Sequence, residues 1–206
     1  MSIIKELIFT PTCLSCGSLG NNLCSACSSK ISPFAGKPIT NVAQTYCSSP
    51  YEGWVRDKLI EYKNGRQRNA PALASALMTV FQISDFANPI TLVPIPSSPE
   101  KIADRGFDSI ATLGAEVSRN LASGPKLTAA LFLKSCVRDQ VGLSAHERKK
   151  NMARAFGARC QLSGDVVLID DVITTGATMS SAAGILRIAG AQRVFGIALC
   201  GSPKSR

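Results

Sequence analysis

The 206-residue sequence lacks the long apolar runs of membrane proteins and the glycine signatures of two common nucleotide-binding folds. No stretch approaches the roughly 20 apolar residues of a transmembrane helix. The opening MSIIKELIFTPTC has too short an apolar segment, and no small-residue cleavage site, for a signal peptide. We therefore expect a cytoplasmic protein without membrane insertion. Neither GxxxxGK(S/T) nor GxGxxG occurs, which argues against a P-loop NTPase and a dinucleotide-binding Rossmann domain.

Acidic, aromatic and histidine residues are also scarce. Asp and Glu number 14 against 23 Lys and Arg, so the formal net charge is +9 and anionic partners are favoured, such as a polyphosphate or a nucleic acid. The basic run between His146 and Arg159 contributes to this charge, although such runs are often only solvated surface. Aromatic residues make up 6% of the chain, which predicts no aromatic-rich platform for stacking single-stranded DNA. We interpret His146, the one histidine, as a loop residue rather than a proton-transfer group.

The order of apolar segments predicts an α/β fold. Buried strands are expected at residues 90–96, 131–134, 166–169 and 193–200. Helices are expected over about 55–62, from about 70 to 81, over about 110–121, and in a segment that ends at Gly190. Residues 30–49, rich in proline and glycine, are expected to form an extended connector. Strands that alternate with helices predict a mostly parallel sheet flanked by helices, with ligand at the carboxyl ends of the strands.

The stretch VVLIDDVITTGAT, residues 166–178, carries the clearest chemical pattern. It predicts a strand buried on both faces that ends at Asp170 and Asp171, followed by a Thr-Thr-Gly turn into a helix. Unpaired N–H groups at such a turn can bind a phosphate. Because carboxylates accept hydrogen bonds from hydroxyl groups, the acid pair and the turn together suit a ligand such as a ribose 5-phosphate. The alternative is a turn whose polar side chains only cap the helix.

Four of the eight cysteines are clustered near the start of the sequence. They form two CxxC pairs separated by seven residues: Cys13, Cys16, Cys24 and Cys27. Four thiolates in this pattern predict a structural Zn2+ site without an open coordination position. A segment of about forty residues cannot build much of a core, whereas structural zinc contributes ~10 to 16 kcal/mol to small modules. Disulfide pairing or unliganded thiols are the alternatives.

With the acid pair, the threonine turn and the cysteine pairs in this order, the sequence resembles the ComF family, competence proteins with a type I phosphoribosyltransferase domain. The resemblance covers nearly the whole chain. It implies a type I phosphoribosyltransferase-like α/β fold in residues 49–206 and a zinc-binding module with its connector in residues 1–48. It also implies that Asp170 and Asp171 act in catalysis and hold Mg2+-bound phosphoribosyl pyrophosphate (PRPP). The other PRPP-binding residues implied are those of the 5-phosphate loop: Thr174, Thr175, Gly176, Ala177 and Thr178.

Three further blocks are similar to the family. In YEGWVRDKLIEYKNG, Lys63 matches a lysine that approaches the ligand site; a surface lysine near a helix end is the alternative. In VPIPSSPEKIADRGFDS, Ser97, Ser98 and Arg105 are candidates for pyrophosphate binding, unless the prolines only end a strand and RGF packs around Phe107. RDQVGLSAHERKKNMARAF corresponds to a mobile loop that closes over PRPP. Its matching residues are Gln140, Arg148 and Asn151.

The resemblance implies Mg-dependent transfer of phosphoribosyl from PRPP to an unknown acceptor, in the service of DNA uptake and natural transformation. Two alternatives remain open. One is a competence protein that handles single-stranded DNA together with other competence proteins. The other is a sensor that binds PRPP without turnover.

Overall fold

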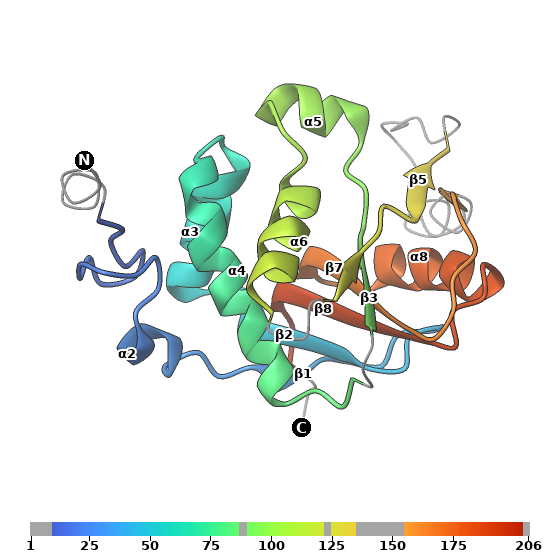
Figure 1. The fold of residues 1–206 in the computed structure, drawn as a ribbon, viewed down its shortest axis with the longest axis horizontal. Coiled ribbons are helices and arrows are strands. Elements are labelled where there is room, and N and C mark those ends of the chain that lie inside the picture. The colour runs from blue at the N-terminus through green and yellow to red at the C-terminus, as the bar shows by residue number, and fades with distance from the viewer. Residues whose placement is uncertain (1–9, 87–89, 122–124, 135–154, 204–206) are drawn as a thin grey trace.

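A computed structural model describes residues 10–86, 90–121, 125–134 and 155–203 of the chain (Figure 1). Six strands form one sheet in the order β1-β2-β8-β7-β3-β4, and β5 and β6 form a separate antiparallel pair. The strands are β1 (Phe34–Ala35), β2 (Thr45–Pro50), β3 (Ile90–Pro94), β4 (Lys126–Leu127), β5 (Leu131–Leu133), β6 (Phe156–Ala158), β7 (Asp165–Ile173) and β8 (Arg193–Gly201). The helices are α2 (Ser25–Ser28), α3 (Gly53–Lys63), η1 (Gln67–Asn69), α4 (Ala70–Met78), η2 (Thr79–Gln82), α5 (Pro99–Arg105), α6 (Ser109–Asn120) and α8 (Ala177–Ile188).

The centre of the sheet is parallel because its strands are apolar on both faces. Residues 166–169 of β7 are fully buried, and β7 pairs in parallel register with β8 on one side and β3 on the other. Only β1 runs antiparallel, at the edge next to β2. The prediction of a largely parallel sheet flanked by helices is confirmed.

The helices divide between the two faces of the sheet. One face is covered by α3, α4 and α6, which lie close together in Figure 1, and its core includes Leu73, Leu77 and Leu113. The other face is covered by α8, through Met179 and Leu186. Local sequence sets the helix ends: Asp108 caps α6 by accepting hydrogen bonds from the N–H groups of residues 110 and 111, as short carboxylates do at this position.

Three local expectations differ from the structure. Residues 30–49 contain β1 and the first five residues of β2, whose register with β8 aligns Thr45 with Gly196, so this segment is part of the sheet rather than only a connector. The strand expected at 131–134 forms, as β5, but pairs with β6 outside the main sheet. The strand with the acid pair does not end at Asp170 and Asp171, because its ladder with β8 continues as far as Ile173.

The order in which the chain adds strands to the sheet reverses between β3 and β7: β3 is followed by β4 at one edge, and β7 is followed by β8 on the other side. From β3 the chain passes through α5 and α6 to β4, with α6 on one face of the sheet; from β7 it passes through α8, on the other face, to β8. Helices that leave neighbouring strands on opposite faces open a crevice at the carboxyl ends of those strands, where α/β proteins bind ligands. Among the described residues, no helix combines the length and apolar character needed to cross a bilayer.

Candidate functional site

The acid pair lies near the carboxyl end of β7, at the topological switch point between β3 and β7. Asp170 is still within the β7–β8 ladder, opposite Ala198, and both acids are partly buried. The two carboxylates leave an extended strand in different directions, because successive side chains alternate between its faces. The Asp171 N–H nevertheless donates a hydrogen bond of 2.8 Å to Asp170 Oδ1, which holds that carboxylate against the backbone.

The electrostatic environment of Asp170 disfavours its negative charge. Burial and then the adjacent charge of Asp171 raise the pKa of Asp170 to about 7. The N–H group of Asp171 and the positive charges of Lys63 and Lys101 oppose this rise. A buried carboxylate whose pKa is raised beside a second acid is a common feature of functional sites.

Lys63 lies directly against the acid pair. Its Nζ atom is 2.6 Å from Oδ2 of Asp171, and the two side chains are only 27% and 15% exposed. Lys63 is the last residue of α3, and its neighbour Tyr62 is buried and donates a hydrogen bond of 2.8 Å to the Ser109 carbonyl oxygen. The structure thus brings together Lys63 and Asp171, two residues singled out in separate sequence blocks. The role of Lys63 toward a ligand stays a prediction.

The threonine turn connects β7 to α8 and lines a small pocket. The pocket is formed by Asp170 together with residues 172–179. Thr174 and Thr175 are exposed at its rim, whereas Gly176 is buried in the left-handed conformation with φ of 75°. Glycine is required there in two ways, since a Cβ atom would also overlap Ile39. At the start of α8 the N-cap Gly176 supplies no side-chain hydrogen bond, and the N–H of Ala177 donates a hydrogen bond of 3.4 Å to the Thr175 hydroxyl.

The loop after β3 approaches the acid pair from the neighbouring strand. The N–H of Ile95 donates to the carbonyl of Ile169, the residue before Asp170. The three candidate side chains of this loop make hydrogen bonds within their own segment. Ser97 donates to Asp108, Ser98 accepts from the Lys101 N–H as the N-cap of α5, and Arg105 donates to the Ser109 hydroxyl. Phe107 packs edge-on against Tyr62, so the RGF block contributes packing as well as charge.

Arg148 lies outside the described residues, as do Gln140, His146 and Asn151. The role of this basic block as a closing loop therefore stays a prediction.

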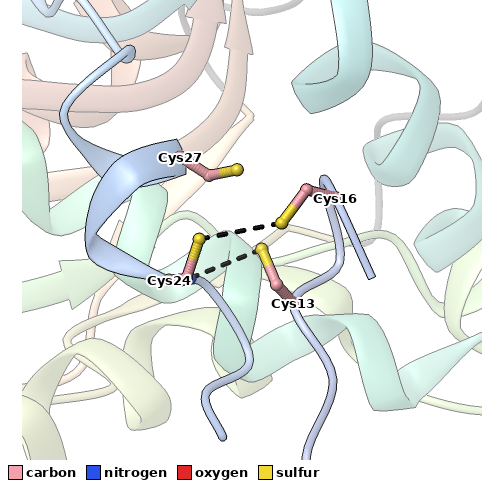
Figure 2. A group of neighbouring side chains, drawn as sticks. All are labelled: Cys13, Cys16, Cys24 and Cys27. Carbon is pink, nitrogen blue, oxygen red and sulfur yellow. Dashed lines mark hydrogen bonds between the residues drawn. The ribbon is translucent and has the colours of Figure 1, made fainter. Parts of the chain in front are cut away.

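The side chains of the four clustered cysteines lie close together, as their spacing predicts (Figure 2). Their Sγ atoms all lie within 4.8 Å of one another, and the sulfurs of Cys16 and Cys24 are 3.8 Å apart. A tetrahedral zinc ion with Zn–S bonds of 2.3 Å separates its sulfurs by about 3.8 Å, so the geometry fits. Burial disfavours the thiolate of Cys13, but N–H donors, first that of Cys24, outweigh it and lower the pKa of Cys13 to about 6. Four cysteines held this close could bind a structural zinc.

Comparison with known proteins identifies a similar competence protein. No family model matches the chain. Competence protein F of Haemophilus influenzae is 31% identical to the chain over 116 residues. The chain is thus similar to a competence protein over part of its length. The match covers 53% of this chain and 50% of that protein, so the chain spans about half the length of the curated relative it matches.

The sequence analysis missed one charged residue near the acid pair. Lys101, in the first turn of α5, is close enough to Asp170 for its charge to lower the pKa of that acid. Its position in the sequence gives no signal, because only the adjacency of β3 and β7 brings the start of α5 to the acid pair. Lys63 and Lys101 thus place two positive charges near the two carboxylates, an arrangement suited to a ligand with both anionic groups and hydroxyl groups.

Proposed function

We propose that the pocket at the turn between β7 and α8 binds PRPP and that the chain is a phosphoribosyltransferase-like protein of the ComF type. The observation that carries the proposal is the contiguity of the acid pair with the threonine turn. Asp170 lines the same pocket as residues 172–179, which include the start of α8. The fold is mostly parallel with the pocket beside its topological switch point, which agrees with a type I phosphoribosyltransferase-like arrangement.

Each element has a role in this proposal. The N–H groups and hydroxyls of Thr174 to Thr178 hold the 5-phosphate at the positive end of α8. Asp170 and Asp171 accept hydrogen bonds from the ribose hydroxyls, directly or through a cation. Carboxylate oxygens are the ligands that Mg2+ prefers in proteins, so the acid pair fits a magnesium ion carried in with PRPP, which when bound supplies positive charge to the pyrophosphate.

The proposed reaction is a substitution at C1 of the ribose. An acceptor nitrogen forms a bond to C1 while the C1–O bond breaks, and the electron pair of that bond leaves with the pyrophosphate. Lys63, Lys101 and Arg105 belong to the segments that surround the departing group, where positive charge stabilises it. Exclusion of water, which we assign to the block containing Arg148, protects the electron-deficient ribose from hydrolysis.

The cysteine cluster is proposed to bind one structural zinc ion. Leu23 and Ile31, on either side of α2, pack against the main core, so the metal would fix the amino-terminal segment onto the α/β domain. We assign it no catalytic role, because four cysteines leave no open position on the ion.

The relative named Competence protein F supports a role in competence, and we propose that PRPP chemistry serves DNA uptake. Direct handling of single-stranded DNA is the second candidate, and the net charge of +9 favours it. A sensor that binds PRPP without turnover uses the same pocket. Release of pyrophosphate across a panel of bases separates an enzyme from a sensor, and the salt dependence of DNA affinity tests the second candidate.

Calorimetric titration with Mg-PRPP tests the central proposal. We expect binding by the wild-type chain and a loss of at least about tenfold in affinity for Asp171→Asn, since a charge-assisted contact is removed. Asp57→Asn is the matched control, because Asp57 is an exposed acid that pairs with Arg56 on α3. Absence of Mg-dependent PRPP binding, or equal affinities in wild type and Asp171→Asn, contradicts the proposal.

A further inference from the structure

We propose that Lys63 is an exchangeable counterion of the acid pair: it neutralises Asp171 in the ligand-free protein and moves to the pyrophosphate when the cation and PRPP arrive together. The inference rests on the proposed function, which assigns Asp171 to the cation or ribose. It adds a competition between Lys63 and the cation for the same carboxylate. The ion pair of 2.6 Å between Lys63 Nζ and Asp171 Oδ2 is the observation that carries it.

This ion pair is more shielded than the Arg56–Asp57 pair on the same helix. The Arg56–Asp57 pair is well exposed, at 42% and 61%, and such pairs contribute little. Lys63 and Asp171 are more shielded, and the end of α3 that carries Lys63 is fixed by Tyr62, whose hydroxyl bonds to Ser109 and whose ring packs on Phe107. The backbone of Lys63 is thus held in place, and the contact with Asp171 does not depend on a freely moving helix end.

The ammonium group and a divalent cation compete for Asp171. Oδ2 of Asp171 already faces Nζ of Lys63, and a divalent ion on the same oxygen would lie within a few ångströms of that positive charge. Among the described residues, the nearby charge of Asp170 attracts a cation, whereas the charge of Lys101 repels it. Mg2+ alone is therefore expected to bind weakly to this site.

Binding of pyrophosphate ends the competition between Lys63 and the cation for Asp171. The negative charges of pyrophosphate offer Lys63 a new partner beside the old one, and the four-carbon stem of lysine lets the ammonium move while α3 stays fixed. Once Lys63 has left, Asp171 is available to the cation or to a ribose hydroxyl. Cation and pyrophosphate then bind with positive coupling, because each favours the state in which Lys63 is released from Asp171.

Opposite changes in cation and anion affinity test the proposal. The probes are Mn2+ alone, measured by paramagnetic resonance, and inorganic pyrophosphate alone, measured by calorimetry. An opposite charge beside a carboxylate shifts its proton affinity by one to three powers of ten, so Lys63→Met is expected to bind Mn2+ about tenfold more tightly than wild type. The same variant is expected to bind pyrophosphate about tenfold more weakly, and Lys63→Arg to change neither affinity by more than about threefold.

Lys58→Met is the matched control, because Lys58 lies on the same helix and pairs with Glu61 instead of the acid pair. It removes the same charge and should change neither affinity. Unchanged or weaker Mn2+ binding in Lys63→Met, or an equal effect of Lys58→Met, overturns the exchange. If Lys63→Met does not fold, the wild-type chain still gives a test: the 15N signal of the Lys63 ammonium must shift when magnesium pyrophosphate is added, and a fixed signal overturns the proposal.

The exchange of Lys63 and the proposed function can be refuted independently of each other. Failure of wild type to bind Mg-PRPP refutes the function, whatever the Mn2+ result. Tight Mg-PRPP binding with Mn2+ affinity unaltered in Lys63→Met leaves the function standing and refutes the exchange.

Discussion

The hydroxyl group of Tyr62 donates a hydrogen bond of 2.8 Å to the main-chain carbonyl oxygen of Ser109. It ties the end of α3 to the start of α6, which are more than forty residues apart in the chain. Because the donor and the acceptor are both buried, Tyr62→Phe is expected to lower the free energy of unfolding by about 1 kcal/mol, as measured in urea. Tyr51→Phe, at a half-exposed ring, is the control. Equal losses in both variants would argue against this tie.

Gly176→Ala tests the conformation of the threonine turn. The φ of 75° is costly for alanine by about 1 to 2 kcal/mol, and the new methyl group meets Ile39. We expect a loss of stability by about this amount, measured by chemical denaturation, together with weaker binding of PRPP. Gly184→Ala, in the middle of α8, is the comparison: its helical backbone suits alanine, and only the end of the Asn41 side chain is near. If Gly176→Ala is as stable as Gly184→Ala, the turn does not require glycine.

The cysteine cluster predicts one zinc ion per chain. Elemental analysis of protein purified under reducing conditions is expected to find one equivalent, and Cys24→Ser should reduce it several-fold, since one of four thiolates is lost. Cys160→Ser keeps the full equivalent, because Cys160 is exposed and outside the cluster. Wild-type protein without zinc refutes the assignment.

The raised pKa of Asp170 predicts a dependence of stability on pH. Between the usual aspartate value of 3.8 and about 7, the folded state holds a proton at Asp170 that the unfolded state has released. The folded state therefore binds more protons in this window, and this group makes stability fall as pH rises through it. Asp170→Asn removes the contribution, so its stability relative to wild type should be greater at pH 8 than at pH 5. Urea unfolding of both proteins at pH 5 and pH 8 measures the difference in their free energies of unfolding. If that difference is the same at both pH values, the pKa of Asp170 is not raised.

Much of the fold follows from the spacing of apolar residues and from the residues that cap helices and form turns. Residues 166–169 and 90–94 form buried parallel strands as expected, because their apolar runs have no polar face. The helix with Leu113 and Val117 forms as its spacing predicts, and α3 ends at Lys63 with Asn64 as its C-cap, followed by Gly65 in a left-handed conformation. Local sequence is sufficient for these elements.

β2 could not be predicted in the same way. Its sequence, TYCSSP, has no apolar run, and Thr45 and Ser48 are buried only because the strand lies beside β8. The contact between Lys63 and Asp171 is likewise invisible in the sequence: each residue could be singled out, but their pairing depends on how α3 packs over the sheet. Tertiary packing decided both features.

The position of β8 between β2 and β7 has a consequence for how the protein is made. Thr45 is translated about 150 residues before its register partner Gly196. Until β8 is made, the edge of β2 that pairs with β8 therefore has no partner strand. Open strand edges invite pairing with other chains. Insertion of β8 is the step that joins the early and late parts of the sheet. Premature termination before β8 would leave one truncated chain in which β1-β2 and β7-β3-β4 are not joined and each has an aggregation-prone edge.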